Sequence, residues 1–81
     1  MSPTLDEIRA LLAKIDAGGA AAGVGDRQSL LAAGVIDSVA MVDLIHELET
    51  TFGIHLDDAD LTPENFDSVV AIRDLVDRKR V

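Results

Sequence analysis

The residues of this chain that could carry chemistry are Asp37 and Ser38, which stand side by side before a strongly patterned segment. A serine hydroxyl at a helix start suits a covalently attached phosphate ester, because free backbone N–H groups and the helix dipole both stabilise the anion. Asp37 could help to hold a divalent cation during such a transfer. The alternative, which local sequence leaves open, is that Ser38 is an ordinary N-cap serine.

A self-contained active site is difficult to build around this serine. A nucleophilic serine needs a neighbouring base, and the only histidines of the chain are His46 and His55. His46 would lie two turns along the same helix, which is too far for a hydrogen bond to Ser38. His55 falls in a connection between helices. We therefore expect no catalytic residues and do not expect an enzyme.

The acidic residues at positions 57 to 64 raise the alternative of a calcium site. An EF-hand loop counted from Asp58 requires glycine where Pro63 stands and glutamate where Val69 stands. Because this pattern fails, we predict an acidic loop and no metal ligands.

A second Asp-Ser-Val, at residues 67–69, also precedes a predicted helix. Ser68 would lie inside the apolar arc of that helix, and no acidic, valine-bearing face follows it. We predict that this second motif is a capping element, with Asp67 as the cap of the last helix.

The segment from Ser38 to Phe52 has two contrasting faces on a helical wheel. One arc of about 100° has the width of a core-facing stripe and carries Met41, Leu44, Ile45, Leu48 and Phe52. The opposite side places two valines among polar side chains: Val39, Val42, Asp43, His46, Glu47 and Thr50. Apolar side chains on a solvent-facing surface indicate docking. We predict that the partner-binding residues are Val39, Val42, Asp43, His46 and Glu47.

The elements that position these residues are all predicted to be helical. Apolar residues at helical spacing from Leu5 to Ile15 predict a first helix, opened by Ser2-Pro3 or by a Thr4–Glu7 capping box and stopped at residues 16–19. A long connection follows, with a short turn near residues 29–33. We expect its apolar side chains to pack into the core: Leu30, Leu31, Val35 and Ile36. Gly53 ends the second helix, residues 62–64 open a short third helix, and a final helix follows. The prediction is one all-α domain, residues 1–81, forming a small four-helix bundle.

Charge and composition exclude several classes of function. The net charge is −8, and between residues 26 and 60 only Arg27 opposes the acids. Such a field repels nucleic acid and anionic lipid and steers basic protein surfaces toward the second helix, although a solvated acidic face is the simpler alternative. The chain has no cysteine, so it has neither disulfides nor thiolate metal sites. No apolar run reaches the length of a membrane span, and we expect a cytoplasmic protein.

Taken together, these motifs resemble those of the acyl and peptidyl carrier protein family. The matching segments are Leu30-Leu31, residues 34–38, the helix to residues 49–54, and residues 61–69 followed by Ile72 and Leu75. The resemblance implies a 4′-phosphopantetheine arm on Ser38, attached from coenzyme A by a phosphopantetheinyl transferase with magnesium. It also implies that the thiol of this arm carries acyl or aminoacyl groups as thioesters. The implied partners are that transferase, an acyl- or aminoacyl-activating ligase and a downstream transferase or synthase.

The chain departs from the family pattern around the second helix. Val39 stands where leucine is common, Ala40 stands at a position that is often polar, and His46 at one that is often apolar. We expect a free-standing monomeric carrier of an aminoacyl, polyketide, non-ribosomal peptide or other specialised-metabolite pathway. The alternatives are a housekeeping fatty-acid carrier and, in a different class, an unmodified acidic helical adaptor that binds basic partners.

Overall fold

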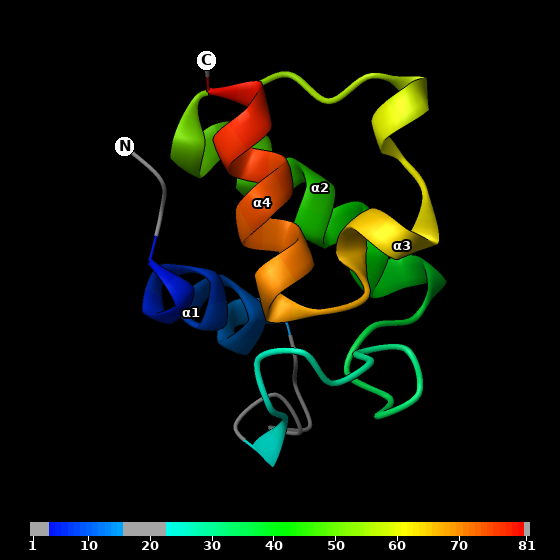
Figure 1. Cartoon of the computed structure of the whole chain (residues 1–81). Coiled ribbons are helices and arrows are strands. Elements are labelled where there is room, and N and C mark those ends of the chain that lie inside the picture. Colours follow the sequence, from blue (N-terminus) through cyan, green and yellow to red (C-terminus); the bar gives the residue numbers. More distant parts are fainter. Residues whose placement is uncertain (1–3, 16–22, 81) are drawn as a thin grey trace.

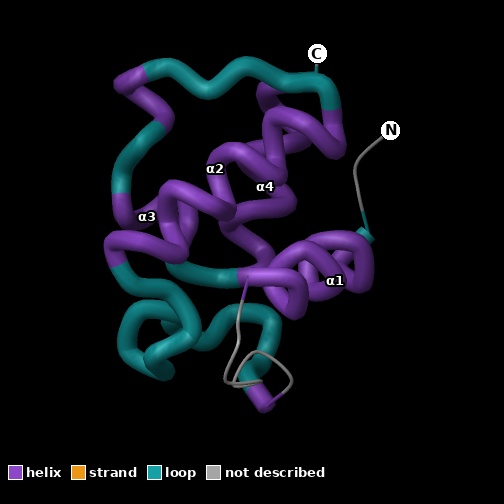
Figure 2. Tube along the Cα trace, turned by 180° about the vertical axis from the view of Figure 1, so that it is seen from behind, coloured by secondary structure: helices purple, strands orange, loops and turns teal. Residues whose placement is uncertain are grey.

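The structure is a computed structural model that describes residues 4–15 and 23–80, except for the side chain of Ser38 (Figure 1). The predicted Ser2-Pro3 start and the predicted helix stop at residues 16–19 lie outside the described residues. The described part is helical, with α1 (Leu5–Ile15), α2 (Ser38–Phe52), the 3-10 helix η2 (Asp58–Asp60), α3 (Pro63–Phe66) and α4 (Val69–Lys79). α1 packs against both α2 and α4, and α3 packs against α4 (Figures 1 and 2). The predicted all-α four-helix fold is confirmed.

Helix α1 begins with the predicted capping box. The Glu7 backbone N–H donates to Thr4 Oγ1 at 3.1 Å, and the Thr4 N–H donates back to Glu7 Oε1 at 3.4 Å. Both contacts satisfy N–H groups that the first turn of a helix leaves without helical partners. The inner face of α1 buries Ile8, Leu11 and Leu12.

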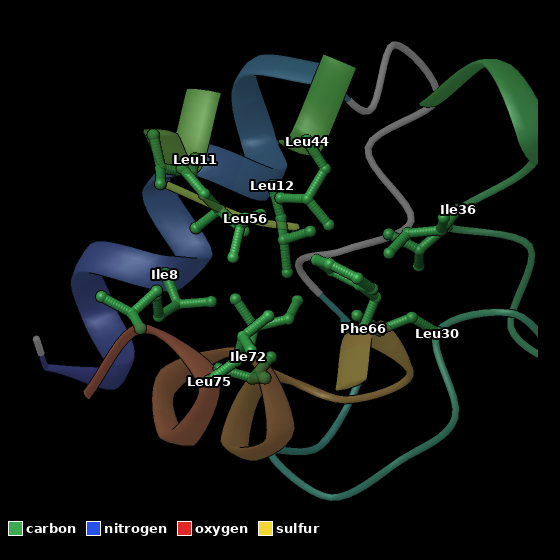
Figure 3. Packing of buried hydrophobic residues seen from close by; sticks show 14 of the residues in the cluster. Ile8, Leu11, Leu12, Leu30, Ile36, Leu44, Leu56, Phe66, Ile72 and Leu75 are labelled. Atoms are coloured by element: carbon green, nitrogen blue, oxygen red, sulfur yellow. The ribbon is translucent and has the colours of Figure 1, made fainter. Parts of the chain in front are cut away.

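The core combines aliphatic side chains from three helices and two connections around one aromatic ring. Figure 3 shows side chains of α1, α2, α3, α4 and the long connection pointing into one interior. The fully buried members include Phe66, Ile8, Leu12, Leu30, Leu44, Leu48, Ile72 and Leu75. In the long connection Leu30, Val35 and Ile36 are buried as predicted. The prediction for Leu31 was wrong, because its side chain is 42% exposed.

The start of α4 corrects the predicted cap. The capping residue is Ser68, whose Oγ accepts a hydrogen bond from the Ala71 N–H at 3.0 Å. Asp67 was predicted to cap this helix, but its carboxylate turns to the long connection and accepts from Ser29 and Leu31. Of two adjacent residues able to cap a helix, the second does so and the first makes a tertiary contact.

The last turn of α4 holds the acidic connection that follows α2. Lys79 Nζ lies 2.8 Å from Asp60 Oδ2 and 3.9 Å from Asp57 Oδ2. The hydrogen bond from Lys79 holds the pKa of the Asp60 carboxyl below its usual value, and the same contact raises the pKa of Lys79. Arg78 also donates to Asn65 Oδ1 at 3.2 Å. These acids therefore have a structural role at the end of the bundle.

Candidate functional site

The connection that enters the site is a compact turn closed by backbone hydrogen bonds. The Ala33 N–H donates to the Ser29 carbonyl at 3.0 Å and the Ala32 N–H to Ser29 Oγ at 3.1 Å, which confirms the predicted turn at residues 29–33. Gly34 follows with φ of 77°, a left-handed conformation that side chains with a Cβ rarely adopt. The N–H groups of Val35 and Ile36 then both donate to the Leu30 carbonyl, at 3.0 and 3.4 Å. The turn therefore leads directly into Asp37.

Asp37 is the cap that starts α2. Its backbone is extended, and its Oδ1 accepts a hydrogen bond from the Ala40 N–H at 2.8 Å. The Met41 N–H donates to the Asp37 carbonyl at 2.9 Å. Ser38 is consequently the first helical residue and is not the cap. Its side chain lies outside the described part of the structure, whereas its neighbours Asp37 and Val39 are both exposed.

The predicted docking face of α2 is largely exposed. Val39 and Val42 expose 74% and 66% of their surface, and Asp43 and His46 are also exposed. Since successive residues of an α-helix turn by about 100°, these four side chains share one side of α2. The opposite side buries Leu44 and Leu48 completely. We call the side formed by Val39, Val42, Asp43 and His46 the docking face.

Glu47 differs from the other predicted partner-binding residues. Its side chain is only 28% exposed, and its Oε2 lies 3.1 Å from Lys14 Nζ of α1. The carboxylate therefore joins two helices at the edge of the docking face, and a cation of the same chain screens its charge. The sequence held no indication of this contact, because Lys14 and Glu47 belong to different helices whose relative rotation is set by packing.

Sequence analysis also missed a second contact, which joins Asp67 to the turn that leads into the site. Asp67 Oδ1 accepts hydrogen bonds from Ser29 Oγ at 2.8 Å and from the Leu31 N–H at 3.1 Å. The Leu30 N–H donates to the Asp67 carbonyl oxygen at 2.8 Å. The one available indication was the Asp-Ser doublet itself, since a single helix start needs only one of these residues.

The described residues hold no group of three or more histidine, aspartate or glutamate side chains arranged to bind a metal ion. His55 Nδ1 lies 3.7 Å from Glu49 Oε2, and Glu49 also accepts from the Leu56 N–H. These contacts tie the connection after α2 to the helix. Within the same described ranges, no helix has the length and apolar character needed to cross a bilayer.

Comparison with known proteins assigns this arrangement to a family. A family model described as a phosphopantetheine attachment site matches residues 6–77. A crystal structure with a TM-score of 0.82 contains an engineered Bradyrhizobium japonicum glycine:[carrier protein] ligase, complexed with a carrier protein from Agrobacterium tumefaciens and AMP. The matching chain of that structure is 33% identical, and the alignment covers 91% of the present chain and 99% of the other. No curated protein sequence matches.

Proposed function

This chain belongs to the family of phosphopantetheine attachment domains, and from that membership we propose that Ser38 is the residue that bears the arm. The chain is a carrier domain whose cofactor is covalently bound 4′-phosphopantetheine. The thiol of this group holds acyl or aminoacyl cargo as a thioester. The observation that carries the assignment to Ser38 is its position as the first residue of α2, between exposed Asp37 and exposed Val39.

The start of α2 fits a phosphate ester in charge and in access. The first turn of a helix offers N–H groups and a positive dipole end to an anion. Among the described residues, the Asp37 side chain accepts a hydrogen bond only from the Ala40 N–H. Because Asp37 and not Ser38 caps the helix, modification of the serine oxygen leaves the cap intact. We propose that the Asp37 carboxylate assists the transfer by helping to hold the divalent cation.

We propose that the cargo is an aminoacyl group and that an amino-acid-activating ligase loads it. The support is the structural neighbour, a carrier protein that was crystallised with a glycine:[carrier protein] ligase. Other proposed partners are a phosphopantetheinyl transferase, which attaches the arm, and a transferase or synthase that removes the cargo. The chain itself is proposed to act without catalytic residues, as one monomeric domain over residues 1–81.

The proposed function is tested by mass in two steps. Incubation with coenzyme A, magnesium and a promiscuous phosphopantetheinyl transferase should add the mass of one phosphopantetheine to the whole protein. Incubation of that product with ATP, an amino acid and a glycine-type ligase should then add one aminoacyl group. Absence of the first addition would favour the unmodified adaptor, whereas loading by a fatty-acyl ligase alone would favour a fatty-acid carrier.

Asp43 is the residue of the docking face best suited to a charge-reversal test. Because Asp43 is exposed and has no described ion pair, Asp43→Lys should change the free energy of unfolding by less than about 0.5 kcal/mol. We expect it to slow arm attachment by about 3–10-fold at low salt, since steering by complementary charge acts mainly on association rates. Attachment rates measured at several salt concentrations should converge as salt screens the field.

A matched control for this test is Asp74→Lys. Asp74 is also an exposed helical acid, but it lies on α4 and pairs with Arg73 at 3.0 Å. The same charge change at Asp74 should leave the attachment rate within about twofold of the parent rate, because it is not on the docking face. Equal slowing by both variants would mean that net charge, and not the docking face, sets the rate. Glu47 is unsuitable here, because its reversal would break a contact between two helices, α1 and α2, whereas the pair of Asp74 with Arg73 joins neighbouring residues of α4.

A further inference from the structure

We propose that Asp67 is a positioning residue for the modification site, which holds the connection leading into Ser38 in the conformation that the transferase recognises. This inference rests on the proposed attachment at Ser38. Asp67 lies at the junction of α3 and α4, far from Ser38 in the sequence, and its carboxylate accepts hydrogen bonds from the connection that leads into Ser38. These contacts give Asp67 a route to the modification site through the connection.

The contacts of Asp67 bind three consecutive residues of the connection. Oδ1 accepts from Ser29 Oγ at 2.8 Å and from the Leu31 N–H at 3.1 Å, while the Asp67 carbonyl accepts from the Leu30 N–H at 2.8 Å. The Asp67 side chain is partly buried. Hydrogen bonds to a carboxylate are stronger than those between neutral groups, so this residue is an effective anchor for a segment outside any helix.

Hydrogen bonds and buried side chains join the anchored segment to the start of α2. The carbonyl of Leu30 accepts from the N–H groups of both Val35 and Ile36, and all three side chains are buried. Ile36 immediately precedes the cap Asp37. A shift of the turn at Leu30 would therefore be passed to the residues that orient the first turn of α2.

The rest of the connection is held by buried side chains and by contacts nearer to its start. It contains Gly25 and Gly34, and the latter has a left-handed backbone. Besides the Asp67 contacts, Arg9 donates to the Val24 carbonyl at 2.8 Å and to Asp26 Oδ1 at 2.6 Å, and the Asp26 carbonyl accepts from the Val70 N–H at 3.0 Å. None of these contacts involves the turn at residues 29–31, which Asp67 holds. If the Asp67 carboxylate is removed, only a fraction of molecules holds the turn correctly, and the apparent affinity for the transferase falls by that fraction.

Ser68 provides a matched control in the same place. Its side chain also accepts a backbone hydrogen bond, from the Ala71 N–H at 3.0 Å, but this bond is internal to α4. Ser68→Ala and Asp67→Ala thus remove adjacent polar groups from one junction. Only the second change releases the connection, so a general loss of stability and a loss of positioning can be separated.

The experiment compares the whole protein with its Asp67→Ala, Asp67→Asn and Ser68→Ala variants at a temperature where all are folded. For Asp67→Ala we expect kcat/KM of arm attachment to fall about tenfold, the size of change expected from loss of a charged hydrogen bond. Ser68→Ala should stay within about twofold of the parent, and Asp67→Asn, which keeps an acceptor oxygen, should recover to within about threefold.

A second readout is independent of the transferase. Hydrogen exchange of the Leu31 amide, which donates to Asp67, should become about tenfold faster in Asp67→Ala and stay within about twofold in Ser68→Ala. Should Asp67→Ala not fold, Ser29→Ala removes one of the two donors to the Asp67 carboxylate, together with the acceptor of the Ala32 N–H within the turn, and should slow arm attachment in the same direction. The inference is overturned if Asp67→Ala and Ser68→Ala attach the arm equally fast while the parent is modified normally. A parent that is never modified would instead overturn the proposed function, and with it this inference.

Discussion

Ser38→Ala is expected to abolish arm attachment completely, with no residual modified protein after prolonged incubation with transferase and coenzyme A. The phosphoester needs an oxygen at this position, and a methyl group cannot supply one. The helix should survive the change, because Asp37 is the cap of α2 and alanine has a high helix propensity. Intact mass spectrometry measures the result, and circular dichroism checks that the helical content is unchanged.

The control for this prediction is Ser68→Ala. Ser68 belongs to the second Asp-Ser-Val motif and also stands at a helix start, but its Oγ accepts from the Ala71 N–H as the α4 cap. Ser68→Ala should therefore gain one full arm and lose only some stability, on the order of 1 kcal/mol for a lost cap. Attachment that persists in Ser38→Ala, or that disappears only in Ser68→Ala, would move the modification site to another serine or threonine.

Helices α1, α2 and α4 could be predicted because each carries its apolar periodicity in its own sequence. In α2 the spacing of Leu44 and Leu48 indicates the buried side, the Asp37-Ser38 pair marks the start without deciding which of the two is the cap, and Gly53, with φ of 65°, marks the end. The same argument identified Val39 and Val42 as exposed apolar residues. Periodicity depends on neighbours within a turn or two, so the sequence contains the information needed.

Contacts between elements could not be predicted in this way. Asp67 and Ser68 are both good capping residues, and the choice between them depends on Ser29 and Leu31, which approach only in the folded bundle. Leu31 was expected inside because it is apolar, yet the turn that buries Leu30 necessarily points the next side chain elsewhere. The local pattern determines which residues are able to cap a helix or enter the core, and packing decides which of them do so.

The distribution of charge also differs between the linear sequence and the folded chain. Along the sequence, only Arg27 opposes the acids between residues 26 and 60. In the folded chain, cations from other elements reach four of these acids: Arg9 lies 2.6 Å from Asp26, Lys14 pairs with Glu47, and Lys79 lies 2.8 Å from Asp60 and 3.9 Å from Asp57. The field at the docking face is therefore weaker than the linear sequence indicates. We propose that a partner recognises mainly Asp43 and the two exposed valines of this face.

Leu48→Ala is expected to remove a large part of the stability of the fold. Leu48 is 0% exposed and lies on the inner side of α2 with Leu44. Truncating a buried leucine to alanine costs about 2–5 kcal/mol, because the apolar contacts are lost and a cavity remains. A domain of this length has only about 4–12 kcal/mol to lose, at roughly 0.05–0.15 kcal/mol per residue. Urea unfolding followed by circular dichroism should show a much lower midpoint.

Val42→Ala is the control on the same helix, because it also removes apolar carbons but from a side chain that is 66% exposed. It should change the free energy of unfolding by less than about 0.5 kcal/mol, with the higher helix propensity of alanine offsetting the lost contacts. For partner recognition we expect the reverse order: Val42→Ala should weaken recognition more than Leu48→Ala, since Val42 lies on the docking face and Leu48 does not. Similar stability losses in both would mean that α2 is rotated from the orientation described, and the docking face would then have to be reassigned.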